Sequence, residues 1–226
     1  LNVYLLNSLN PFRLEGQKSI IFEIVQGFRW RPPDWIVLPA GNLGNTAAFG
    51  KALYELQQLG LIDRVPRVAA VQAAGANPFY QGFQQGFREP VTVQAETVAT
   101  AIRIGAPVSY ERAIRTMGWT DGLVTQVSDA EIMDAKAMVD GVGIGCEPAS
   151  AAAVAGARKL VLEGTIDPDQ TVVSVLTGNL LKDPAATVAY HTGEWPDAAY
   201  ANRPLSVPAE MRVVRKVIEE TVDKSQ

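Results

Sequence analysis

The stretch Trp35-Ile36-Val37-Leu38-Pro39-Ala40-Gly41-Asn42-Leu43-Gly44-Asn45-Thr46 carries the pattern on which the fold prediction depends. Its first four residues form a short apolar run, which predicts a buried strand. Glycines follow, and they let the backbone turn tightly. Apolar residues then recur at helical spacing over residues 46–59, and Gly60 ends that pattern. A strand that passes through a short loop into a helix is typical of a parallel sheet, because parallel strands need crossover connections.

The same alternation of short apolar runs and helical patterns continues along the chain. Further strands are predicted at residues 67–72 and 171–176. Helices are predicted at residues 16–28, 96–104, 128–139, 149–162 and 208–222, the third opened by the capping box Ser128-Asp129-Ala130-Glu131. Residues 191–207, rich in Pro, Gly, Asp and aromatic side chains, are expected to form a long connection. These patterns predict an α/β fold with a mostly parallel twisted sheet flanked by helices.

The composition excludes several classes of protein and of metal site. The 226 residues are 47% hydrophobic, which suffices for a sizeable core and is unlike a disordered tail. With 20 Lys and Arg against 24 Asp and Glu, a chain-wide electrostatic clamp on nucleic acid is not expected. The single cysteine, Cys146, excludes an internal disulfide framework and multi-thiolate zinc sites, and the single histidine, His191, excludes His-rich metal sites.

Targeting and length give further expectations. No apolar run approaches the about 20 residues that a membrane-spanning helix needs. No signal peptide is visible either, so we expect a cytoplasmic protein. The chain begins with Leu1 rather than Met, and we therefore expect a fragment or a processed product. A length of 226 residues suggests one large domain or two small ones.

The loop between the first predicted strand and its helix is the strongest candidate for a binding site. Gly41 and Gly44 allow several backbone N–H groups to converge, and the N-terminus of the helix adds partial positive charge. Such a loop binds an anion without Lys or Arg, and Asn42, Asn45 and Thr46 could add side-chain donors. Its spacing fits neither the P-loop nor the dinucleotide-binding pattern Gly-x-Gly-x-x-Gly. The alternative is an ordinary strand-to-helix turn capped by Asn45 or Thr46.

Two other polar stretches could complete a site. Thr177 and Gly178 follow the strand predicted at 171–176, and a threonine hydroxyl there can hydrogen-bond a ring nitrogen or a carbonyl of a ligand. The alternative is a turn in which Thr177 only caps the strand. Residues 7–13 place amide, hydroxyl and guanidinium donors close together, which suits a second anion. Alternatively, they form a polar loop that caps the helix predicted at 16–28.

Taken in chain order, these stretches resemble the threonine synthase family, which are pyridoxal-phosphate enzymes of the tryptophan-synthase-β-like group. The matching segments span most of the chain: residues 7–18 (NSLNPFRLEGQK), 41–45 (GNLGN), 72–76 (QAAGA), 99–105 (ATAIRIG), 147–152 (EPASAA), 176–178 (LTG) and 181–184 (LKDP). The first two segments together are specific to this family. The Glu-Pro-Ala-Ser-Ala-Ala and Leu-Thr-Gly segments are shared with related dehydratases.

The resemblance implies roles for nine residues. The cofactor phosphate would be held by the backbone N–H groups of Gly41, Asn42, Leu43, Gly44 and Asn45. Thr177 would hydrogen-bond the pyridine nitrogen of the cofactor. The phosphate of the substrate, O-phospho-L-homoserine, would be bound by Asn7, Ser8 and Arg13. The implied reaction converts this substrate and water to L-threonine and phosphate, with pyridoxal phosphate as the electron sink.

The resemblance also implies an architecture, from which the chain departs in two places. Residues 1–226 would be the C-terminal, larger domain of a fold type II enzyme that is a homodimer at full length. The cofactor lysine of the family lies in an N-terminal motif of the type Asn-Pro-Thr-Gly-Ser-Phe-Lys-Asp-Arg, which is not in this chain. We therefore expect the chain to begin midway through the family's sequence, to contain no catalytic residue and to be inactive alone. Leu180 also stands where the family usually has another glycine.

Two alternative functions remain open. A threonine or serine dehydratase of the same fold would not need the anion-binding set Asn7, Ser8 and Arg13. A non-catalytic ligand-binding remnant would account for the missing lysine.

Overall fold

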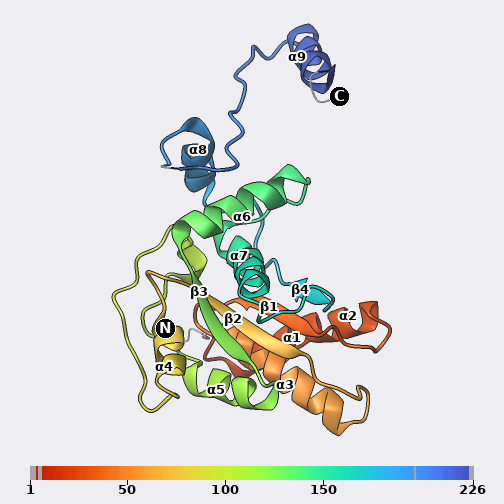
Figure 1. Ribbon diagram of the computed structural model, residues 1–226, viewed down its shortest axis with the longest axis vertical. Helices are drawn as coiled ribbons and strands as arrows, with labels where there is room; N and C mark the ends of the chain where they lie inside the picture. The colour runs from red at the N-terminus through yellow and green to blue at the C-terminus, as the bar shows by residue number, and fades with distance from the viewer. Residues whose placement is uncertain (1–3, 5–6, 196, 224–226) are drawn as a thin grey trace.

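The computed structural model describes residues 4, 7–195 and 197–223 (Figure 1). A sheet of four parallel strands, in the order β3-β2-β1-β4, lies at the centre of the fold. The strands are β1 (Trp35–Pro39), β2 (Arg67–Ala73), β3 (Leu123–Val127) and β4 (Val172–Ser174). β1 pairs in register with β2 and β4, beginning at Trp35↔Arg67 and Trp35↔Val172. The predicted α/β fold with a parallel sheet is confirmed.

Helices cover both faces of this sheet. One face carries α1 (Pro11–Gln17), α2 (Ser19–Gly27), α3 (Gly44–Gln58), α4 (Pro78–Gln84) and α5 (Tyr110–Trp119), and the other carries α6 (Asp129–Gly141) and α7 (Pro148–Leu162). Side chains alternate along β1, so Ile36 and Leu38 pack in the first layer and Trp35 and Val37 in the second. All four are fully buried, as is typical of a strand inside a parallel sheet.

Small residues allow α7 to pack closely on the sheet. Most of its buried positions are alanines, and a Cβ at Gly156 would overlap the Val71 side chain of β2. Because α7 runs back along the sheet, this packing holds its first turn, with Ala149, beside the carboxyl ends of the strands.

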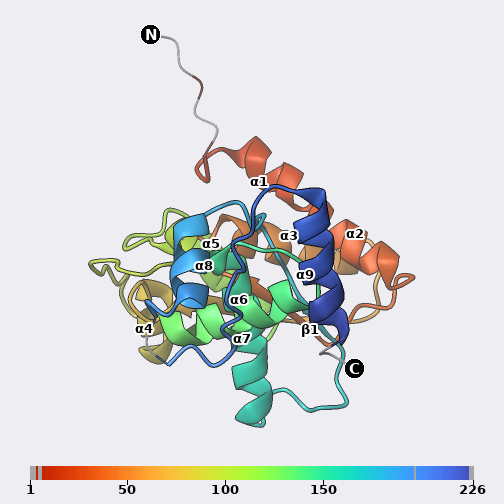
Figure 2. The same ribbon diagram turned by 90° about the horizontal axis from the view of Figure 1, so that it is seen from above.

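The C-terminal part of the chain extends away from the sheet. α8 (Pro184–Thr192) is followed by the expected long connection and by α9 (Met211–Asp223), close to the predicted last helix. Figure 1 shows α9 displaced from the sheet along the longest axis, and Figure 2, seen down that axis, shows it in front of the other elements. In the described part of the chain, no helix is long and apolar enough to span a membrane.

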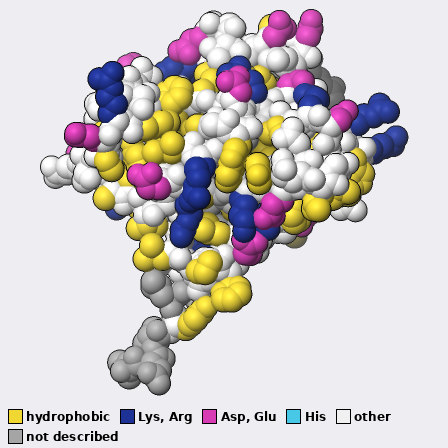
Figure 3. All heavy atoms as spheres, turned by 90° about the horizontal axis from the view of Figure 1, so that it is seen from below, with side chains coloured by type: hydrophobic (Ala, Val, Ile, Leu, Met, Phe, Trp, Pro, Cys, Tyr) yellow, Lys and Arg dark blue, Asp and Glu magenta, His cyan; other side chains and the backbone are white. Residues whose placement is uncertain are grey.

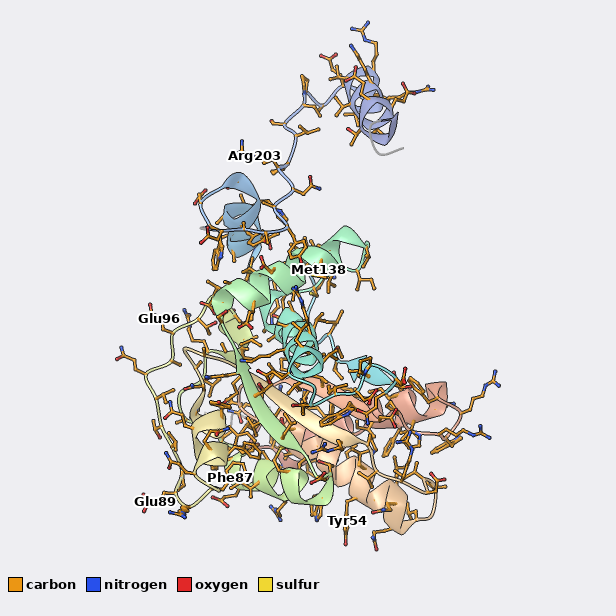
Figure 4. The ribbon with its side chains drawn as sticks, in the orientation of Figure 1. Tyr54, Phe87, Glu89, Glu96, Met138 and Arg203 are labelled. Carbon is orange, nitrogen blue, oxygen red and sulfur yellow. The ribbon has the colours of Figure 1, made fainter. Side chains whose placement is uncertain are left out.

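The helix predicted at residues 96–104 is wrong. This segment contains only the short 3-10 helix Thr100–Ile102, and its extended course is visible at the label of Glu96 in Figure 4. Thr97 Oγ1 donates to the Asp129 carboxylate at 2.5 Å, so a partner distant in sequence fixes the segment. Val98 N donates to the other oxygen of that carboxylate at 3.1 Å, and Glu96 N donates to Gly75 O at 2.8 Å, so backbone donors of this segment are bonded to distant residues.

The other elements differ from prediction in extent or were not predicted. The helix expected at 16–28 is two helices, and α1 begins earlier because Asn10 Oδ1 accepts from Phe12 N at 2.9 Å and Pro11 suits a first turn. The capping box of Ser128 and Glu131 at the start of α6 is confirmed. The sequence patterns did not predict β3, α4, α5 or α8.

Candidate functional site

A cavity of about 220 Å³ opens at the carboxyl ends of β1 and β4, where the first turns of α1, α3 and α7 meet. The nine residues to which the sequence analysis gave roles all line it: Asn7, Ser8, Arg13, Gly41, Asn42, Leu43, Gly44, Asn45 and Thr177. Ligands of open α/β sheets bind beyond the carboxyl ends of the strands, so the cavity lies where a site is expected. The roles themselves remain predictions.

The loop before α3 presents unpaired backbone donors to this cavity. The N–H groups of residues 41–46 have no acceptor among the described residues, and the first regular bond of the helix runs from Ala47 N to Leu43 O at 2.9 Å. Leu43, the residue before α3, has a left-handed conformation with φ of 64°. Several free N–H groups at a helix N-terminus make a site for an anion such as a phosphate.

Two glycines let other segments approach this loop. A Cβ at Gly41 would lie 3.0 Å from Ala101 O, and a Cβ at Gly44 would lie 3.2 Å from Ser8 Oγ. Gly41 therefore gives room to the chain around the 3-10 helix. Gly44 lets Ser8, in the N-terminal polar stretch, pack closely against the loop of residues 41–46, here called the anion loop.

Ser109 joins the two polar segments and was not foreseen. Its N–H donates to Asn42 O at 3.2 Å, and its Oγ donates to Ser8 O at 3.4 Å. Ser109 is 1% exposed and precedes α5, which the sequence analysis did not predict. No local sequence signal connects a serine at this position with partners as distant in sequence as Ser8 and Asn42.

Two polar atoms in the cavity wall are buried and have no partner in the described structure. They are Thr46 Oγ1 and Gln17 Oε1, and both residues line the cavity. A buried polar atom without a partner costs free energy, so these atoms fit a ligand that supplies the missing hydrogen bonds. Thr46 was foreseen as a possible donor but was given no role, and Gln17 was noted only as part of a motif.

The N-terminal polar stretch is built as a capped helix start. Asn7 Oδ1 accepts from Leu9 N at 3.0 Å, and Asn10 caps α1, whose first turn carries Arg13 into the cavity wall. Arg13 is the one cationic side chain among the described residues that line the cavity. On the face shown in Figure 3, Lys and Arg side chains lie among acidic and apolar ones rather than in one block.

The Thr177 turn forms another part of the cavity wall and is held by α7. Ser150 Oγ accepts from Thr177 N at 2.9 Å and from Gly178 N at 2.8 Å, and it lies 3.1 Å from Thr177 Oγ1. Glu147, 2% exposed, places its Oε1 3.5 Å from Thr177 Oγ1. Lys182 Nζ lies 3.0 Å from the other carboxylate oxygen of Glu147. The Thr177 turn is therefore held in place by side chains.

The leucine that replaces the usual glycine is accommodated. Leu180 packs against Gly145, where a Cβ would overlap the leucine side chain. Next to Gly145, Cys146 forms an isolated bridge with Asn179, which connects the turn to the start of α7. The substitution thus leaves the Thr177 turn attached to α7.

The cavity offers binding groups but few groups for covalent chemistry. Of the described lysines, none lines it. Cys146 is buried outside the cavity wall, and desolvation raises the pKa of its thiol to about 11, so the thiol stays protonated at neutral pH. No group of three or more metal-ligating side chains occurs in the part of the chain that the structure describes.

Comparison with known proteins identifies the family. The model of the family described as "Pyridoxal-phosphate dependent enzyme" matches residues 1–178. The threonine synthase of Methanocaldococcus jannaschii is 39% identical over 220 residues, covering 96% of this chain and 52% of the relative. The threonine synthase of Methanosarcina acetivorans is 47% identical over 189 residues, covering 82% of this chain and 46% of the relative. The chain thus spans about half the length of the curated relatives that it matches.

Solved structures share the fold. Threonine synthase from Escherichia coli superposes with a TM-score of 0.66 at 20% identity, over 95% of this chain and 50% of that one. A fungal L-serine ammonia-lyase from Rhizomucor miehei superposes with a TM-score of 0.64 at 23% identity, over 75% of this chain and 53% of that one. The predicted resemblance and fold class are therefore confirmed, and the chain belongs to the pyridoxal-phosphate dependent enzyme family.

Proposed function

We propose that this chain is the cofactor- and substrate-binding portion of a threonine synthase, which converts O-phospho-L-homoserine and water to L-threonine and phosphate. The observation that carries the proposal is the cavity at the strand ends, which combines unpaired amides at residues 41–46 with the donors of Asn7, Ser8 and Arg13. A cavity with two groups of anion-binding donors suits two phosphates, one on the cofactor and one on the substrate.

The residues present fit pyridoxal phosphate. The N–H groups of residues 41–46 are the proposed phosphate site, and the buried Thr46 hydroxyl, which has no partner among the residues that the structure describes, adds a donor there. Thr177, which also lines the cavity, is the proposed partner of the ring nitrogen. When bound, the cofactor supplies an electron sink for the reacting carbons, while the protein orients it and excludes water.

Asn7, Ser8 and Arg13 are the proposed site for the phosphate of the substrate. Ser8 is 7% exposed and lies against Gly44, so the substrate phosphate would lie next to the anion loop. Arg13 supplies a planar fork of donors that matches a phosphate. This second group of donors favours a phosphorylated substrate over the unphosphorylated amino acids that a dehydratase uses.

The reaction also needs a lysine to hold the cofactor and to move protons between carbon atoms. None of the described lysines lines the cavity, so we propose that residues 1–226 are the larger-domain portion and that the lysine belongs to the part of the family's length that they do not cover. A homodimer at full length and a cytoplasmic location are the corresponding expectations. The chain alone is then expected to bind cofactor without turnover.

The test is an assay of phosphate release from O-phospho-L-homoserine. We expect no turnover by the chain alone and turnover when the lysine-bearing half of a related threonine synthase is supplied as a separate polypeptide. Robust turnover by the chain alone would overturn the argument about the lysine. Failure of the chain to bind pyridoxal phosphate at all would overturn the proposed function.

Arg13→Ala distinguishes this function from a dehydratase. In the complemented enzyme, losing a charged donor to phosphate is expected to weaken O-phospho-L-homoserine binding about 10- to 100-fold, measured as a rise in KM. Turnover of unphosphorylated threonine or serine, unaffected by Arg13→Ala, is the result expected of a dehydratase.

A further inference from the structure

Ser150, in the first turn of α7, is fully buried and contacts the turn that carries Thr177. Its Oγ accepts hydrogen bonds from Thr177 N at 2.9 Å and from Gly178 N at 2.8 Å. Thr177 Oγ1 lies 3.1 Å from the same oxygen, a distance that suits a hydrogen bond between the two hydroxyls in either direction.

The count of lone pairs decides that direction. A serine hydroxyl has two acceptor lone pairs and one proton to donate. The N–H groups of Thr177 and Gly178 occupy both lone pairs of Ser150 Oγ, so this oxygen has no capacity left to accept from the Thr177 hydroxyl. Ser150 therefore donates its proton to Thr177 Oγ1.

The proton of the Thr177 hydroxyl is then available to the cavity. Its remaining acceptor among the described residues is Glu147 Oε1 at 3.5 Å, which is too long for a strong hydrogen bond. Thr177 also lines the cavity, where a ligand acceptor can approach to an ordinary distance. Accepting from Ser150 polarises the Thr177 hydroxyl and makes it a stronger donor.

We propose that Ser150 is a positioning residue that fixes the Thr177 hydroxyl as a donor into the cavity, so that the Thr177 turn selects a ligand with a neutral, unprotonated acceptor. The inference rests on the proposed function, in which that acceptor is the ring nitrogen of pyridoxal phosphate. After accepting from Ser150, Thr177 Oγ1 keeps one lone pair. It could accept from a protonated ring nitrogen only by turning its own proton to the long contact with Glu147 Oε1 at 3.5 Å, so an unprotonated nitrogen is the better partner.

The test compares pyridoxal phosphate with the analogue in which a C–H group replaces the ring nitrogen. Both ligands are titrated into the 226-residue chain by calorimetry, and the ratio of their dissociation constants isolates the bond to the ring nitrogen. For the unaltered chain we expect the natural cofactor to bind about tenfold more tightly than the analogue. In Ser150→Ala the ratio is expected to approach one, while binding of inorganic phosphate at the anion loop is unchanged.

Three variants separate positioning from a loss of stability. Ser150→Thr retains the hydroxyl and is expected to restore the ratio. Ser128→Ala removes the cap of α6, outside the cavity wall, and is expected to keep the ratio while lowering stability. Thr177→Val is expected to bring the ratio of dissociation constants to about one. Adding Ser150→Ala to Thr177→Val should not change this ratio further, because Ser150 acts through Thr177.

A second measurement needs no variant. Nitrogen NMR of ring-labelled pyridoxal phosphate bound to the unaltered chain is expected to show an unprotonated, hydrogen-bonded ring nitrogen. A pyridinium signal, or an unchanged affinity ratio in Ser150→Ala, overturns the role of Ser150 and leaves the proposed function standing. If the unaltered chain binds neither ligand, the proposed function fails and this inference fails with it.

Discussion

The anion loop and the Thr177 turn, which both line the cavity, are prepared for a ligand in different ways. At the anion loop, the backbone N–H groups of residues 41–46 are left unpaired, and close approach at Gly41 and Gly44 determines the shape of the loop. At the Thr177 turn, the backbone N–H groups are already satisfied by Ser150, and one hydroxyl proton is left for a ligand. The anion loop therefore attracts a negatively charged group with many donors, whereas the Thr177 turn offers one donor with a fixed orientation.

Gly178→Ala is expected to have the largest effect, because it disturbs the side-chain contacts that hold the Thr177 turn. A Cβ at this position would overlap the carboxylate of Glu147, which is 2% exposed and has little room to move. We expect the free energy of unfolding to fall by about 2–3 kcal/mol, measured by urea denaturation. Gly118→Ala in α5, where a Cβ meets nothing within 4 Å, is the matched control and should not destabilise the chain. Equal stability of the two variants would show that the Thr177 turn is not rigid.

Thr46→Val tests the anion loop. It removes a buried hydroxyl that has no partner in the described part of the chain, so the ligand-free chain should be as stable as the original or slightly more stable. Affinity for pyridoxal phosphate is expected to fall about tenfold, since a bond to a charged group is lost, whereas affinity for pyridoxal without phosphate should not change.

The control for Thr46→Val is Thr187→Val. Thr187 Oγ1 is also buried without a partner among the described residues, but Thr187 lies on α8 outside the cavity wall. A similar loss of cofactor affinity in both variants would argue against a specific role for Thr46.

Gly41→Ala, also in the anion loop, has a smaller expected effect. The added Cβ would lie 3.0 Å from Ala101 O and from Ile102 Cα, so the backbone must shift by a few tenths of an ångström. We expect a loss of about 1 kcal/mol in unfolding free energy, with a parallel fall in phosphate affinity measured by calorimetry. In Gly16→Ala, where the Cβ meets nothing within 4 Å, neither quantity should fall.

Glu15→Gln has the smallest expected effect and tests how α1 is held against α3. Hydrogen bonds from Lys18 and Lys51 lower the pKa of Glu15 from its usual value of 4.5. The ionised carboxylate therefore stabilises the fold above pH 4.5, and this contribution is lost as the pH falls through the lowered pKa of the folded state. At pH 7 the variant should lose about 0.5 kcal/mol, because the Glu15 carboxylate is exposed and water screens its ion pairs. Denaturation curves that still differ well below that pKa would contradict this assignment.

The sequence predicts the parts of the site that depend on local backbone rules. A buried strand followed by glycines and a helix start requires free N–H groups at the junction, and the structure has them at residues 41–46. The same reasoning placed a hydroxyl, Thr177, directly after a strand at the same edge of the sheet. These features follow from a few neighbouring residues.

The parts that escaped prediction depend on contacts between distant segments. Ser109 joins Ser8 to Asn42, and Ser150 orders the turn at Thr177, yet a serine in isolation gives no sign of either partner. The helix expected at 96–104 failed for the same reason, since Asp129 captures Thr97. Local pattern cannot show which hydrogen bonds a chain makes after it has closed on itself.

The position of β4 at the edge of the sheet has a consequence for how the protein folds. β4 joins β1 through contacts that span most of the chain, such as Thr171 N to Asp34 Oδ2 and Trp35 Nε1 to Gln170 Oε1. Contacts of such long sequence separation form slowly. Thr177 follows β4 and lines the cavity together with the anion loop, so we expect cofactor binding to appear only after β4 has joined the sheet.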